Sequence, residues 1–255
     1  MKGLKITVIT VAYNSASTIS DTLRSVATQT HPNVEHILVD GASTDETMTI
    51  VATHGAHLAK VVSECDKGIY DAMNKGVRLA TGEVVGFINS DDFYAQPEAL
   101  AKVVRAFADD TVDAVYGDLC YVRQDATSEV VRYWRSCEFV PGLFNQGWCP
   151  PHPTLFVRRR VYERCGVFDL RYRIAADVEL MTRLFELHRI RSVYLPEVLV
   201  HMRMGGTTNR NWANVMTQNR EIWRALNDHG LKPSLFKFAA GKIVSRGRQL
   251  LSRPQ

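Results

Sequence analysis

The chain has 255 residues, of which 45% are hydrophobic and 23% are charged, as in an ordinary globular protein. Its formal net charge of +4 is too small to indicate a nucleic-acid-binding protein. The length suits one large α/β domain, or one such domain with an appendage.

Cysteine usage and the N-terminal segment predict a cytosolic protein. The five cysteines are an odd number and have no C-x-x-C spacing, which favours reduced thiols over a disulfide framework or a zinc site. The apolar run after Met1 is too short for a secretion signal and lacks an Ala-x-Ala cleavage site. No apolar stretch reaches the length that spans a bilayer. We therefore expect a cytoplasmic protein.

The first half of the chain alternates between apolar runs and segments whose apolar residues have helical spacing. The apolar runs predict strands at Leu4–Tyr13, Glu35–Val39, Leu58–Ser63 and Val84–Ile88. Between and after them, helices are predicted at Ser17–Gln29, from a Ser43-x-x-Glu46 capping box to about Thr53, at Ile69–Leu79 and at Pro97–Phe107. This alternation implies right-handed crossovers and a largely parallel sheet.

The second half has a different pattern. After a strand at Asp113–Gly117, the segments Cys120–Arg123 and Glu129–Arg135 predict antiparallel strands. The segment Val140–Pro153 is rich in Gly, Pro and aromatic residues, which favours a loop that lines a site. The other predicted elements are a strand at Thr154–Val157, an extended segment at Val193–Met202, and helices at Arg159–Cys165, Ala176–His188 (with Leu180, Leu184 and Leu187 inward) and Asn211–His229.

Polar residues follow each of the first four predicted strands, at Tyr13-Asn14, Asp40, Glu64 with Asp66, and Asn89–Asp92. In a parallel sheet these ends share one edge, where open α/β sheets bind ligands. Taken alone, Asn89–Asp92 is either a turn that caps the next helix or a cation site, since adjacent carboxylates repel and favour a counter-cation. Four clusters on one edge favour a site. Neither Gly-x-Gly-x-x-Gly after the first strand nor Gly-Lys-Ser/Thr occurs, which disfavours a dinucleotide site and a P-loop.

Four motifs together carry a family resemblance: ITVITVAYN, DGASTDET, ECDKGIYDAMNKG and NSDD, at residues 6–14, 40–47, 64–76 and 89–92. As a set they resemble the GT-A glycosyltransferases of family 2, which are inverting enzymes with nucleotide-sugar donors, and in particular bacterial enzymes of exopolysaccharide, capsule or O-antigen synthesis. The resemblance implies a Rossmann-like, mostly parallel sheet flanked by helices, with a small antiparallel acceptor-side portion. It divides the chain into a donor half (1–117), an acceptor half (118–230) and a C-terminal helical tail (231–255).

The resemblance also implies roles for the strand-end residues. Asp40 would accept a hydrogen bond from the nucleotide base, Asp91 would contact the ribose, and Asp92, with Asp91, would bind Mg²⁺ or Mn²⁺. Many relatives carry Asp where this chain has Asn89, so the metal site would depend on the other two residues. The complete donor-binding set is Ala12, Tyr13, Asn14, Asp40, Asp66, Asp71, Asn74, Lys75, Asn89, Ser90 and Asp91. In that set, Asp71, Asn74 and Lys75 fall within one helical turn and are expected to share a face.

Inversion needs a base for the acceptor hydroxyl, and the family places a carboxylate at a helix start in the second half. Asp177 fits that position, with a plain N-cap as the alternative reading and Glu179 as the second choice for the base. Trp148 and His152 resemble positions on the acceptor side, and His201 a late metal ligand. The Gly205–Thr208 segment is expected to close over the diphosphate, with Arg203 or Arg210 nearby.

The segment Ser234–Arg253 is basic and amphipathic, which suits either an anionic membrane surface or a helix docked on the domain. Together these features predict transfer from a nucleoside-diphosphate sugar, by default a UDP-sugar, to a lipid-linked glycan at the cytoplasmic face of the inner membrane. Two alternatives are a sugar-1-phosphate nucleotidyltransferase and a non-catalytic nucleotide-sugar-binding module. The first would need a Gly-rich loop with Arg or Lys after the first strand, and Tyr13–Ala16 does not provide one.

Overall fold

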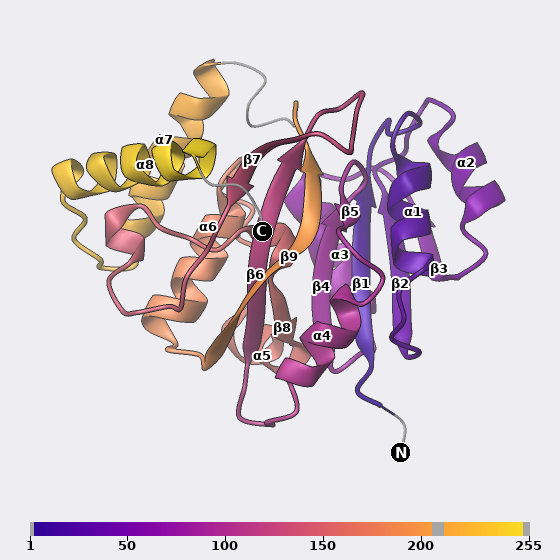
Figure 1. The fold of residues 1–255 in the computed structure, drawn as a ribbon, viewed down its shortest axis with the longest axis horizontal. Helices are drawn as coiled ribbons and strands as arrows, with labels where there is room; N and C mark the ends of the chain where they lie inside the picture. Colours follow the sequence, from indigo (N-terminus) through magenta and orange to yellow (C-terminus); the bar gives the residue numbers. More distant parts are fainter. Residues whose placement is uncertain (1–2, 206–211, 252–255) are drawn as a thin grey trace.

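A nine-stranded sheet forms the centre of the computed structural model, which describes residues 3–205 and 212–251 (Figure 1). The strand order is β3-β2-β1-β4-β8-β6-β9-β5, with β7 paired to β6. The strands are β1 (Ile6–Ala12), β2 (Val34–Asp40), β3 (Leu58–Ser63), β4 (Val84–Asn89), β5 (Phe93–Tyr94), β6 (Ala114–Val122), β7 (Val130–Trp134), β8 (Phe156–Arg158) and β9 (Ser192–Arg203).

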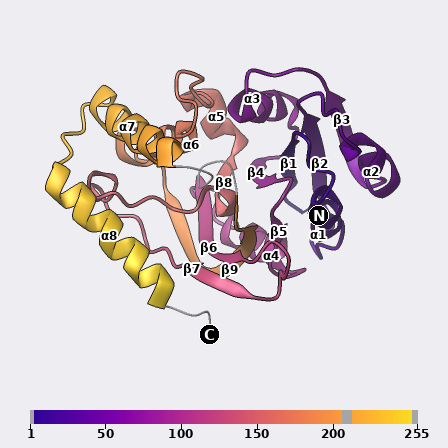
Figure 2. The same cartoon turned by 90° about the horizontal axis from the view of Figure 1, so that it is seen from above.

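Helices cover both faces of this sheet. They are α1 (Ile19–Ala27), α2 (Thr47–His54), α3 (Ile69–Leu79), α4 (Ala99–Ala106), α5 (Arg159–Cys165), α6 (Ala176–Thr182), α7 (Trp212–Asp228) and α8 (Leu235–Leu251). Viewed from above, α3, α5, α6 and α7 lie on one side of the strands, and α1 and α4 lie on the other (Figure 2). Two short 3₁₀ turns, η1 (Phe144–Gln146) and η2 (His152–Thr154), and a π turn, η3 (Arg183–Leu187), complete the described elements.

Strands β1 to β4 form the parallel half, as the sequence predicted. Strand β1 lies between β2 and β4, with Ile9 opposite both Ile37 and Phe87. Every residue of β1 is buried, because helices cover both of its faces and its β-branched side chains fill them. By contrast, β3 is an edge strand that exposes most of its residues, including Lys60, a charge that discourages pairing with another chain. The order β3-β2-β1-β4 places the four strand-end clusters along one edge.

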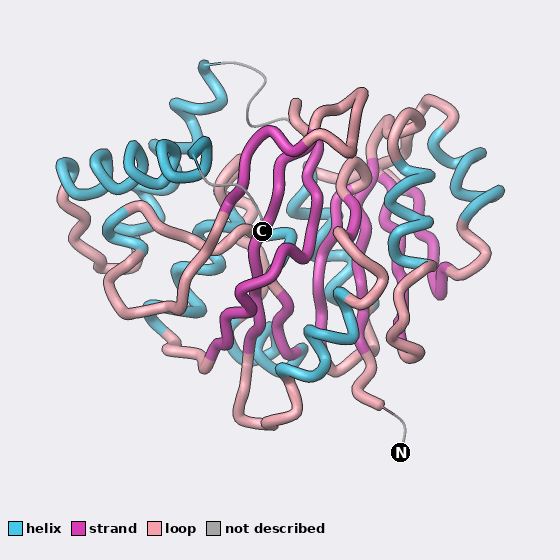
Figure 3. Tube along the Cα trace, in the orientation of Figure 1, coloured by secondary structure: helices cyan, strands magenta, loops and turns pink. Residues whose placement is uncertain are grey.

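The second half of the sheet is mixed. Strand β8 is antiparallel to both β4 and β6, whereas β6 runs parallel to β9. The residues predicted as two strands, Asp113–Gly117 and Cys120–Arg123, form the single buried strand β6. Its first residues pair with β8 and its last residues with β7; Figure 3 draws the strands of the sheet in magenta. The sequence did not predict β5, a two-residue strand that pairs with β9 at the far edge.

Three local predictions need correction. The Ser43-x-x-Glu46 capping box does not form, because α2 begins one residue after Glu46, while the Ser43 hydroxyl bonds to Asp40 instead. The predicted helix Ala176–His188 is α-helical only to Thr182 and continues as the π turn. Leu187, expected inward, is 41% exposed, since the wider π turn rotates the last residues away from the core.

In the described part of the chain, no helix combines the length and the apolar character that crossing a membrane requires. All five cysteines are free thiols.

Candidate functional site

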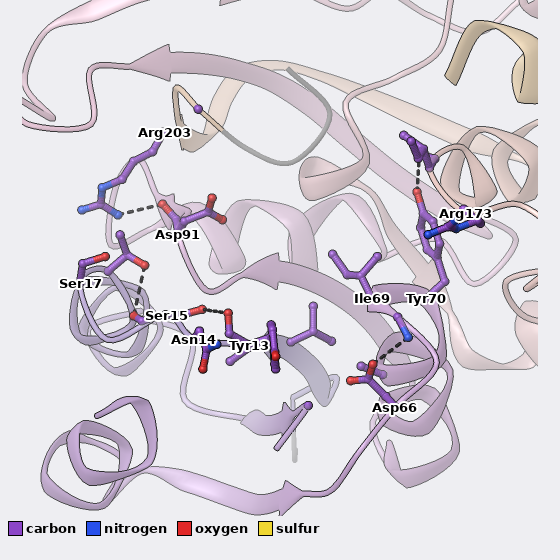
Figure 4. A pocket seen from close by; sticks show the side chains of 18 of the residues that line it. Tyr13, Asn14, Ser15, Ser17, Asp66, Ile69, Tyr70, Asp91, Arg173 and Arg203 are labelled. Carbon is purple, nitrogen blue, oxygen red and sulfur yellow. Dashed lines mark hydrogen bonds between the residues drawn. The ribbon is translucent and has the colours of Figure 1, made fainter. Parts of the chain in front are cut away.

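A pocket of about 840 Å³ opens at the carboxyl edge of β1 to β4. Its walls come from the end of β1, the turns after β2 and β3, the start of α3, Asp91 after β4, and the end of β9. Figure 4 shows Asp91 and Arg203 on one side of the pocket, Asp66 on another, and Tyr70 with Arg173 on a third. A pocket of this size can enclose a ligand as large as a nucleotide, since small-molecule sites commonly occupy roughly 300–1,000 Å³.

The turn after β1 supplies Tyr13 and Asn14 to this pocket. The Tyr13 ring is 64% exposed and offers an open aromatic face. Asn14 adopts the left-handed conformation with φ 49°, which asparagine tolerates better than most residues. Its Oδ1 accepts a hydrogen bond from the Thr44 amide (2.9 Å), so the side chain ties the ends of β1 and β2 together. The predicted residue Ala12 also lines the pocket.

Asp40 lies at the end of β2 and is fully buried. Its carboxylate accepts hydrogen bonds from the Ser43 amide (3.0 Å), the Ser43 hydroxyl and the Ser63 hydroxyl (2.7 Å). These partners already occupy the oxygens that were predicted to face a nucleotide base. Asp66 lines the pocket instead, and a Cβ added at Gly41 would lie 2.6 Å from Asp66 Oδ2. Because Gly41 has no side chain, the Asp66 carboxylate can lie close to the end of β2.

Asn89, Asp91 and Asp92 form a compact group at the end of β4. Asn89 Nδ2 donates to Asp92 Oδ2 (3.0 Å), so the amide that replaces a carboxylate here orients its neighbour. Asn89 Oδ1 and Asp92 Oδ1 are buried and have no hydrogen-bond partner in the described part of the chain. Burying such oxygens without a partner costs about 1–3 kcal/mol each. These two unpaired buried oxygens, one from an amide and one from a carboxylate, lie beside the second carboxylate, Asp91, and together they fit a hard divalent cation, which prefers oxygen ligands.

The electrostatics of this group agree with that fit. Burial raises the pKa of Asp91, and Arg203 opposes the increase. Burial and then repulsion by Asp91 raise the pKa of Asp92 well above its usual value. Arg203 donates to the Asp91 carbonyl oxygen (2.8 Å) and pairs with Asp21, so its charge already has a partner. The two carboxylates therefore favour an added cation when both are ionised.

Other predicted donor-side residues have protein partners. Ser90 is buried and is not among the residues that line the pocket. Its hydroxyl lies 2.7 Å from the hydroxyl of Ser15, which lines the pocket. Lys75 donates to the Cys65 carbonyl oxygen (2.9 Å) and pairs with Glu64 (3.0 Å). Its Nζ also lies 4.0 Å from Asp71, so Lys75 and Asp71 share a face as predicted.

Asn74 does not share that face. It is 4% exposed, and its amide forms a closed pair with the backbone of Phe168, donating at 2.9 Å and accepting at 3.0 Å. The structure therefore gives it a structural contact between α3 and the segment before α6. The prediction that Asn74 faces the donor pocket is corrected, because both ends of its amide are bonded elsewhere.

Asp177 lies at the start of α6, as predicted, and its carboxylate meets α3. The Tyr70 hydroxyl lies 2.9 Å from Asp177 Oδ1 and 2.8 Å from the carbonyl oxygen of Ile174, and it can donate to either. Burial, followed by the charge of Asp177, raises the pKa of Tyr70 well above its ordinary value. Tyr70 lines the first pocket and Asp177 lines a second one, so this contact lies where the two pockets meet.

Glu221 of α7 holds the segment that leads into α6. Its carboxylate accepts hydrogen bonds from three consecutive backbone amides, those of Arg173 (3.0 Å), Ile174 (2.8 Å) and Ala175 (2.9 Å). The helix has no side-chain cap of its own, and Glu221 therefore fixes its approach from outside. Glu179, the second choice for the base, is buried, and its carboxylate pairs with Arg183 and His229. These contacts give Glu179 a structural role.

The second pocket has a volume of about 220 Å³. It is lined by Trp148 and His152, the two residues that the sequence assigned to an acceptor side, and by residues of β6, β7, β9, α6, α7 and α8. Burial lowers the pKa of His152, although the charge of Asp177 opposes the decrease. Glu186 of the π turn accepts hydrogen bonds from the Gly142 amide (2.8 Å) and the Phe144 amide (3.4 Å). These bonds hold the loop of residues 140–153 against the core.

His201, on β9, is not brought into a metal group. Its ring packs edge-on against Phe93, with 5.4 Å between the centroids. Within residues 3–205 and 212–251, no cluster of three or more His, Cys, Asp or Glu residues could hold a metal by itself. A cation at Asp91 and Asp92 would therefore need further oxygens from a ligand. Of the predicted closing loop, the residues Gly206–Thr208 and Arg210 lie outside the described residues.

Sequence reasoning did not assign roles to Tyr70, Arg173 or Glu221. Tyr70 is the one polar aromatic residue in the motif GIYDAMNKG, and this is the only signal in the sequence that it has a role. That signal does not identify Asp177 as its partner. Arg173 lines the first pocket from a segment with no periodic pattern. Glu221 is separated from its three partners by about 46 residues or more, and no local signal connects them.

With this geometry established, comparison with known proteins identifies the class. Residues 7–165 match the family described as glycosyl transferase family 2. A PGL/p-HBAD biosynthesis glycosyltransferase of Mycobacterium bovis is 32% identical over 207 residues, which cover 79% of this chain and 78% of the relative. An uncharacterized glycosyltransferase of Nostoc is 29% identical over 229 residues, covering 86% and 70%. The chain belongs to glycosyl transferase family 2 and is a glycosyltransferase.

Solved structures support the fold. Staphylococcus aureus TarS has a TM-score of 0.65 at 20% identity, with 93% of this chain and 41% of that chain covered. A mannosyltransferase of Pyrobaculum calidifontis, solved with GDP-Man and Mn²⁺, has a TM-score of 0.62 at 22% identity, with 99% and 82% covered. The mixed sheet with its mostly parallel first half is accordingly a GT-A-like fold, as the sequence motifs predicted.

Proposed function

We propose that this glycosyltransferase moves a sugar from a nucleoside-diphosphate sugar to an acceptor hydroxyl with inversion, using Asp177 as the base. The observation that carries the proposal is the Tyr70–Asp177 contact (2.9 Å), where the large pocket at the strand ends meets the smaller aromatic pocket. An inverting transfer needs a base on the opposite face of the sugar from the leaving diphosphate. A carboxylate at the junction of two pockets suits that requirement.

The first pocket is the proposed donor site. Tyr13 would stack on the nucleobase, since its ring is 64% exposed at the pocket wall. Asp66 and Asp91 offer carboxylates for the base and the ribose, and Arg173 offers positive charge for the diphosphate. TarS has been solved with UDP and with UDP-GlcNAc. That precedent supports a UDP-sugar as the first donor to test.

The proposed metal is Mg²⁺ or Mn²⁺, held by Asp91 and Asp92 with Asn89 in support. The unpaired buried oxygens of Asn89 and Asp92 motivate this assignment. When bound, the ion would supply Lewis-acid neutralisation of charge on the departing diphosphate. The amide at position 89 removes one charge from the group and orients Asp92 through its hydrogen bond.

The protein's own contribution to the chemistry is positioning and proton transfer. Asp177 takes the proton of the acceptor hydroxyl as the oxygen attacks the sugar carbon, and the nucleoside diphosphate departs into the first pocket. The Tyr70 hydroxyl, whose raised pKa keeps it protonated, holds the carboxylate by donating to it. Trp148 and His152 form the acceptor side, and the neutral imidazole expected from the lowered pKa of His152 leaves the base its negative charge.

The test is nucleotide release by Asp177→Asn with UDP-GlcNAc and Mn²⁺. Turnover should be lost while the donor still raises the melting temperature, because the change removes the base and keeps the donor pocket. Glu179→Gln tests the second choice in the same assay. Unchanged turnover in Asp177→Asn would refute the assignment of the base. Absence of any stabilisation by a nucleoside-diphosphate sugar would refute the donor class.

The acceptor is proposed to be lipid-linked, with α8 contacting the inner face of the membrane. Gly241 lies so close to η1 that an added Cβ would meet the Gln146 carbonyl oxygen, so one side of α8 is docked on the domain. On α8, Phe236 (82%) and Val244 (51%) remain exposed. Exposed apolar residues on a basic helix suit an anionic lipid surface.

This attachment predicts that Phe236→Glu combined with Val244→Glu weakens sedimentation with phosphatidylglycerol liposomes. Met216→Glu on α7, also a change at an exposed apolar residue, is the matched control. Equal sedimentation of all three proteins would contradict the membrane role and leave the transferase proposal intact. The division into a donor half, an acceptor half and a tail rests on the same two-pocket arrangement.

A further inference from the structure

The loop of residues 64–68 joins β3 to α3 at the wall of the first pocket, and two charged side chains of α3 hold it. Lys75 Nζ donates to the Cys65 carbonyl oxygen (2.9 Å) and pairs with the Glu64 carboxylate (3.0 Å). Asp71 Oδ2 lies 4.0 Å from the same Nζ. The hydrogen bond with Glu64 raises the pKa of Lys75, so the side chain stays charged and keeps these contacts. Lys75 therefore fixes the first two residues of the loop.

The second half of the loop is also held by side-chain oxygens. Asp71 Oδ2 accepts a hydrogen bond from the Lys67 amide (3.1 Å), and Asp66 Oδ1 accepts one from the Gly68 amide (2.7 Å). Lys75 and Asp71 are largely buried, so solvent screens their contacts less than those of a surface pair. Side chains of α3 thus restrain the backbone on both sides of Asp66.

In the described part of the chain, Asp66 keeps one carboxylate oxygen without a hydrogen bond. Oδ1 holds the Gly68 amide, whereas no described residue donates to Oδ2. By contrast, both oxygens of Asp40, the residue expected to read the nucleotide base, accept hydrogen bonds from serines of the protein. Of these two carboxylates, Asp66 is therefore the one that can offer an unoccupied oxygen to a ligand.

The unoccupied oxygen lies near the exposed ring of Tyr13. A Cβ built on Gly41 would lie 2.6 Å from Asp66 Oδ2 and 3.4 Å from Tyr13 Cδ2, so both groups meet at the end of β2. Both residues line the first pocket (Figure 4). An aromatic ring binds the flat face of a nucleobase by stacking, and a carboxylate beside the ring can accept from an N–H group at the edge of the base. This corner of the pocket therefore suits a nucleobase.

The arrangement favours a base with a single N–H group at its edge. Guanine presents two parallel N–H donors that match both oxygens of a carboxylate, but Asp66 Oδ1 already accepts from the Gly68 amide. The N3–H group of uracil needs one acceptor oxygen. A hydrogen bond to an ionised carboxylate is about twice as strong as a neutral one, so one such bond is enough to select the base.

We propose that Lys75 and Asp71 are positioning residues for nucleobase recognition, which hold the loop so that Asp66 Oδ2 accepts a hydrogen bond from N3–H of uracil. The proposal rests on the proposed function and deepens it by naming the residue that reads the base and the pair that places it. The base contact moves from Asp40 to Asp66. Lys75 and Asp71 act through the loop and do not touch the nucleotide, in contrast to their expected place among the donor contacts.

The experiment measures binding by calorimetry in the presence of Mn²⁺. The probes are UDP, 3-methyl-UDP, which lacks the N3–H group, and inorganic pyrophosphate, which lacks the nucleoside. The wild-type protein should prefer UDP to 3-methyl-UDP by roughly tenfold or more, as expected for a hydrogen bond to a charged group. Lys75→Met should weaken UDP binding roughly tenfold and remove most of this preference, because the bond is no longer aligned. Pyrophosphate binding should be unchanged.

Further variants make this result specific. Lys75→Arg keeps the charge and the donors and should recover part of the affinity for UDP. Asp71→Ala removes the contact to the Lys67 amide and should show the same pattern as Lys75→Met. Arg78→Met, a change of the same kind at an exposed residue of α3, is the matched control and should leave all affinities unchanged. Unfolding temperatures and pyrophosphate binding show whether each variant keeps the pocket intact.

A double-mutant cycle tests whether Lys75 acts through Asp66. Asp66→Ala removes the carboxylate and should weaken UDP binding at least as much as Lys75→Met. Combining the two changes should cost no more than Asp66→Ala alone, because a positioning residue has no effect once the group that it places is gone. Additive losses would overturn the positioning role.

Other outcomes would also overturn the proposal. Equal losses for UDP and pyrophosphate in Lys75→Met would mean that this lysine binds the diphosphate itself. Wild-type affinity for UDP in Lys75→Met or Asp71→Ala would remove that residue from the pair, and equal binding of UDP and 3-methyl-UDP by the wild-type protein would remove the base contact. Each can occur while UDP-GlcNAc still stabilises the protein and Asp177 is still required for nucleotide release. Failure of the proposed function would instead abolish UDP binding in the wild-type protein.

Discussion

The two halves of the sheet build their pockets in different ways. The first pocket, the proposed donor site, lies at the ends of β1 to β4, which are adjacent, parallel and consecutive in the chain. The second pocket, the proposed acceptor side, is lined by residues of β6, β7, the loop before η2, α6, β9, α7 and α8, between positions 121 and 249. The first pocket follows from the repeating strand–helix unit, whereas the second depends on contacts between segments distant in sequence.

This difference shows which residues a substitution can affect. At the strand ends, side chains act where the sheet edge places them, so a change there is local. Around Asp177, the geometry depends on supports such as Tyr70 and Glu221, which come from other elements. The second pocket should therefore be sensitive to changes at residues that do not line it.

The largest effect is expected for Asp177→Asn, the variant that most directly distinguishes the roles of the two pockets. Loss of a positioned general base typically costs roughly 10²- to 10⁴-fold in rate. We expect turnover to fall by that factor, measured as UDP release, while the affinity for the donor changes little. A parallel loss of donor affinity would mean that the residue supports the first pocket and that the two pockets are not functionally separate.

The next largest effect is expected for Asp92→Asn. It is compared with Asn89→Asp, a change in the same group of residues at the end of β4. Asp92→Asn should lower Mn²⁺-dependent turnover roughly 100-fold, because a bound metal contributes several kcal/mol of charge stabilisation. Asn89→Asp adds a third carboxylate, so the protein should be less stable without metal and more strongly stabilised by Mn²⁺. Thermal unfolding with and without Mn²⁺ measures both. If neither variant changes the response to Mn²⁺, the cation does not bind here.

A third prediction concerns the parallel half alone and uses pH. Burial, and then the charge of His57, lowers the pKa of His36 from 6.5 to about 3. The unfolded chain thus binds a proton that the folded chain excludes. Stability should be full above about pH 6.5 and fall as the pH decreases toward 3, by about 2 kcal/mol between pH 7 and pH 5. Urea unfolding at the two pH values measures it.

The controls for this prediction are His36→Gln and His54→Gln. The first should remove most of the difference between pH 7 and pH 5, and the second, at an exposed residue, should leave it unchanged. Glu35 does not interfere, because its pKa, lowered to about 2 by its hydrogen bonds despite burial, affects stability only below about pH 4.5. A pH dependence that survives in His36→Gln would assign the sensitivity to another group, such as His152.

The smallest predicted effect is that of Glu221→Ala, which tests the long-range support of Asp177, the proposed base. Removing the acceptor of three backbone amides should let the segment before Asp177 move, and small displacements at a reacting group are costly. We expect kcat to fall roughly tenfold with an unchanged KM for the donor. Glu163→Ala, at an exposed glutamate of α5, is the matched control. Equal losses in kcat and donor affinity would indicate general unfolding.

Much of the fold could be predicted from the sequence. Apolar runs in the first half identified β1 to β4, and their alternation with helices identified the parallel order, since each unit folds largely through local contacts. The second half was predicted less well. The strand β6 was divided in two, and β5 was missed, because pairing with β9 rather than local pattern makes these residues strands.

The same division applies to the site. By itself the sequence determined the family, the pocket-lining residues Tyr13, Asn14, Asp66 and Asp91, and the position of Asp177 on a helix start, because periodicity and strand-end chemistry are local properties. Only the tertiary structure decided that Asn74 is a structural amide and that Tyr70 and Glu221 hold the region around Asp177. Those outcomes depend on which distant side chains meet, and partners 46 to 107 residues apart leave no local signal in a single chain.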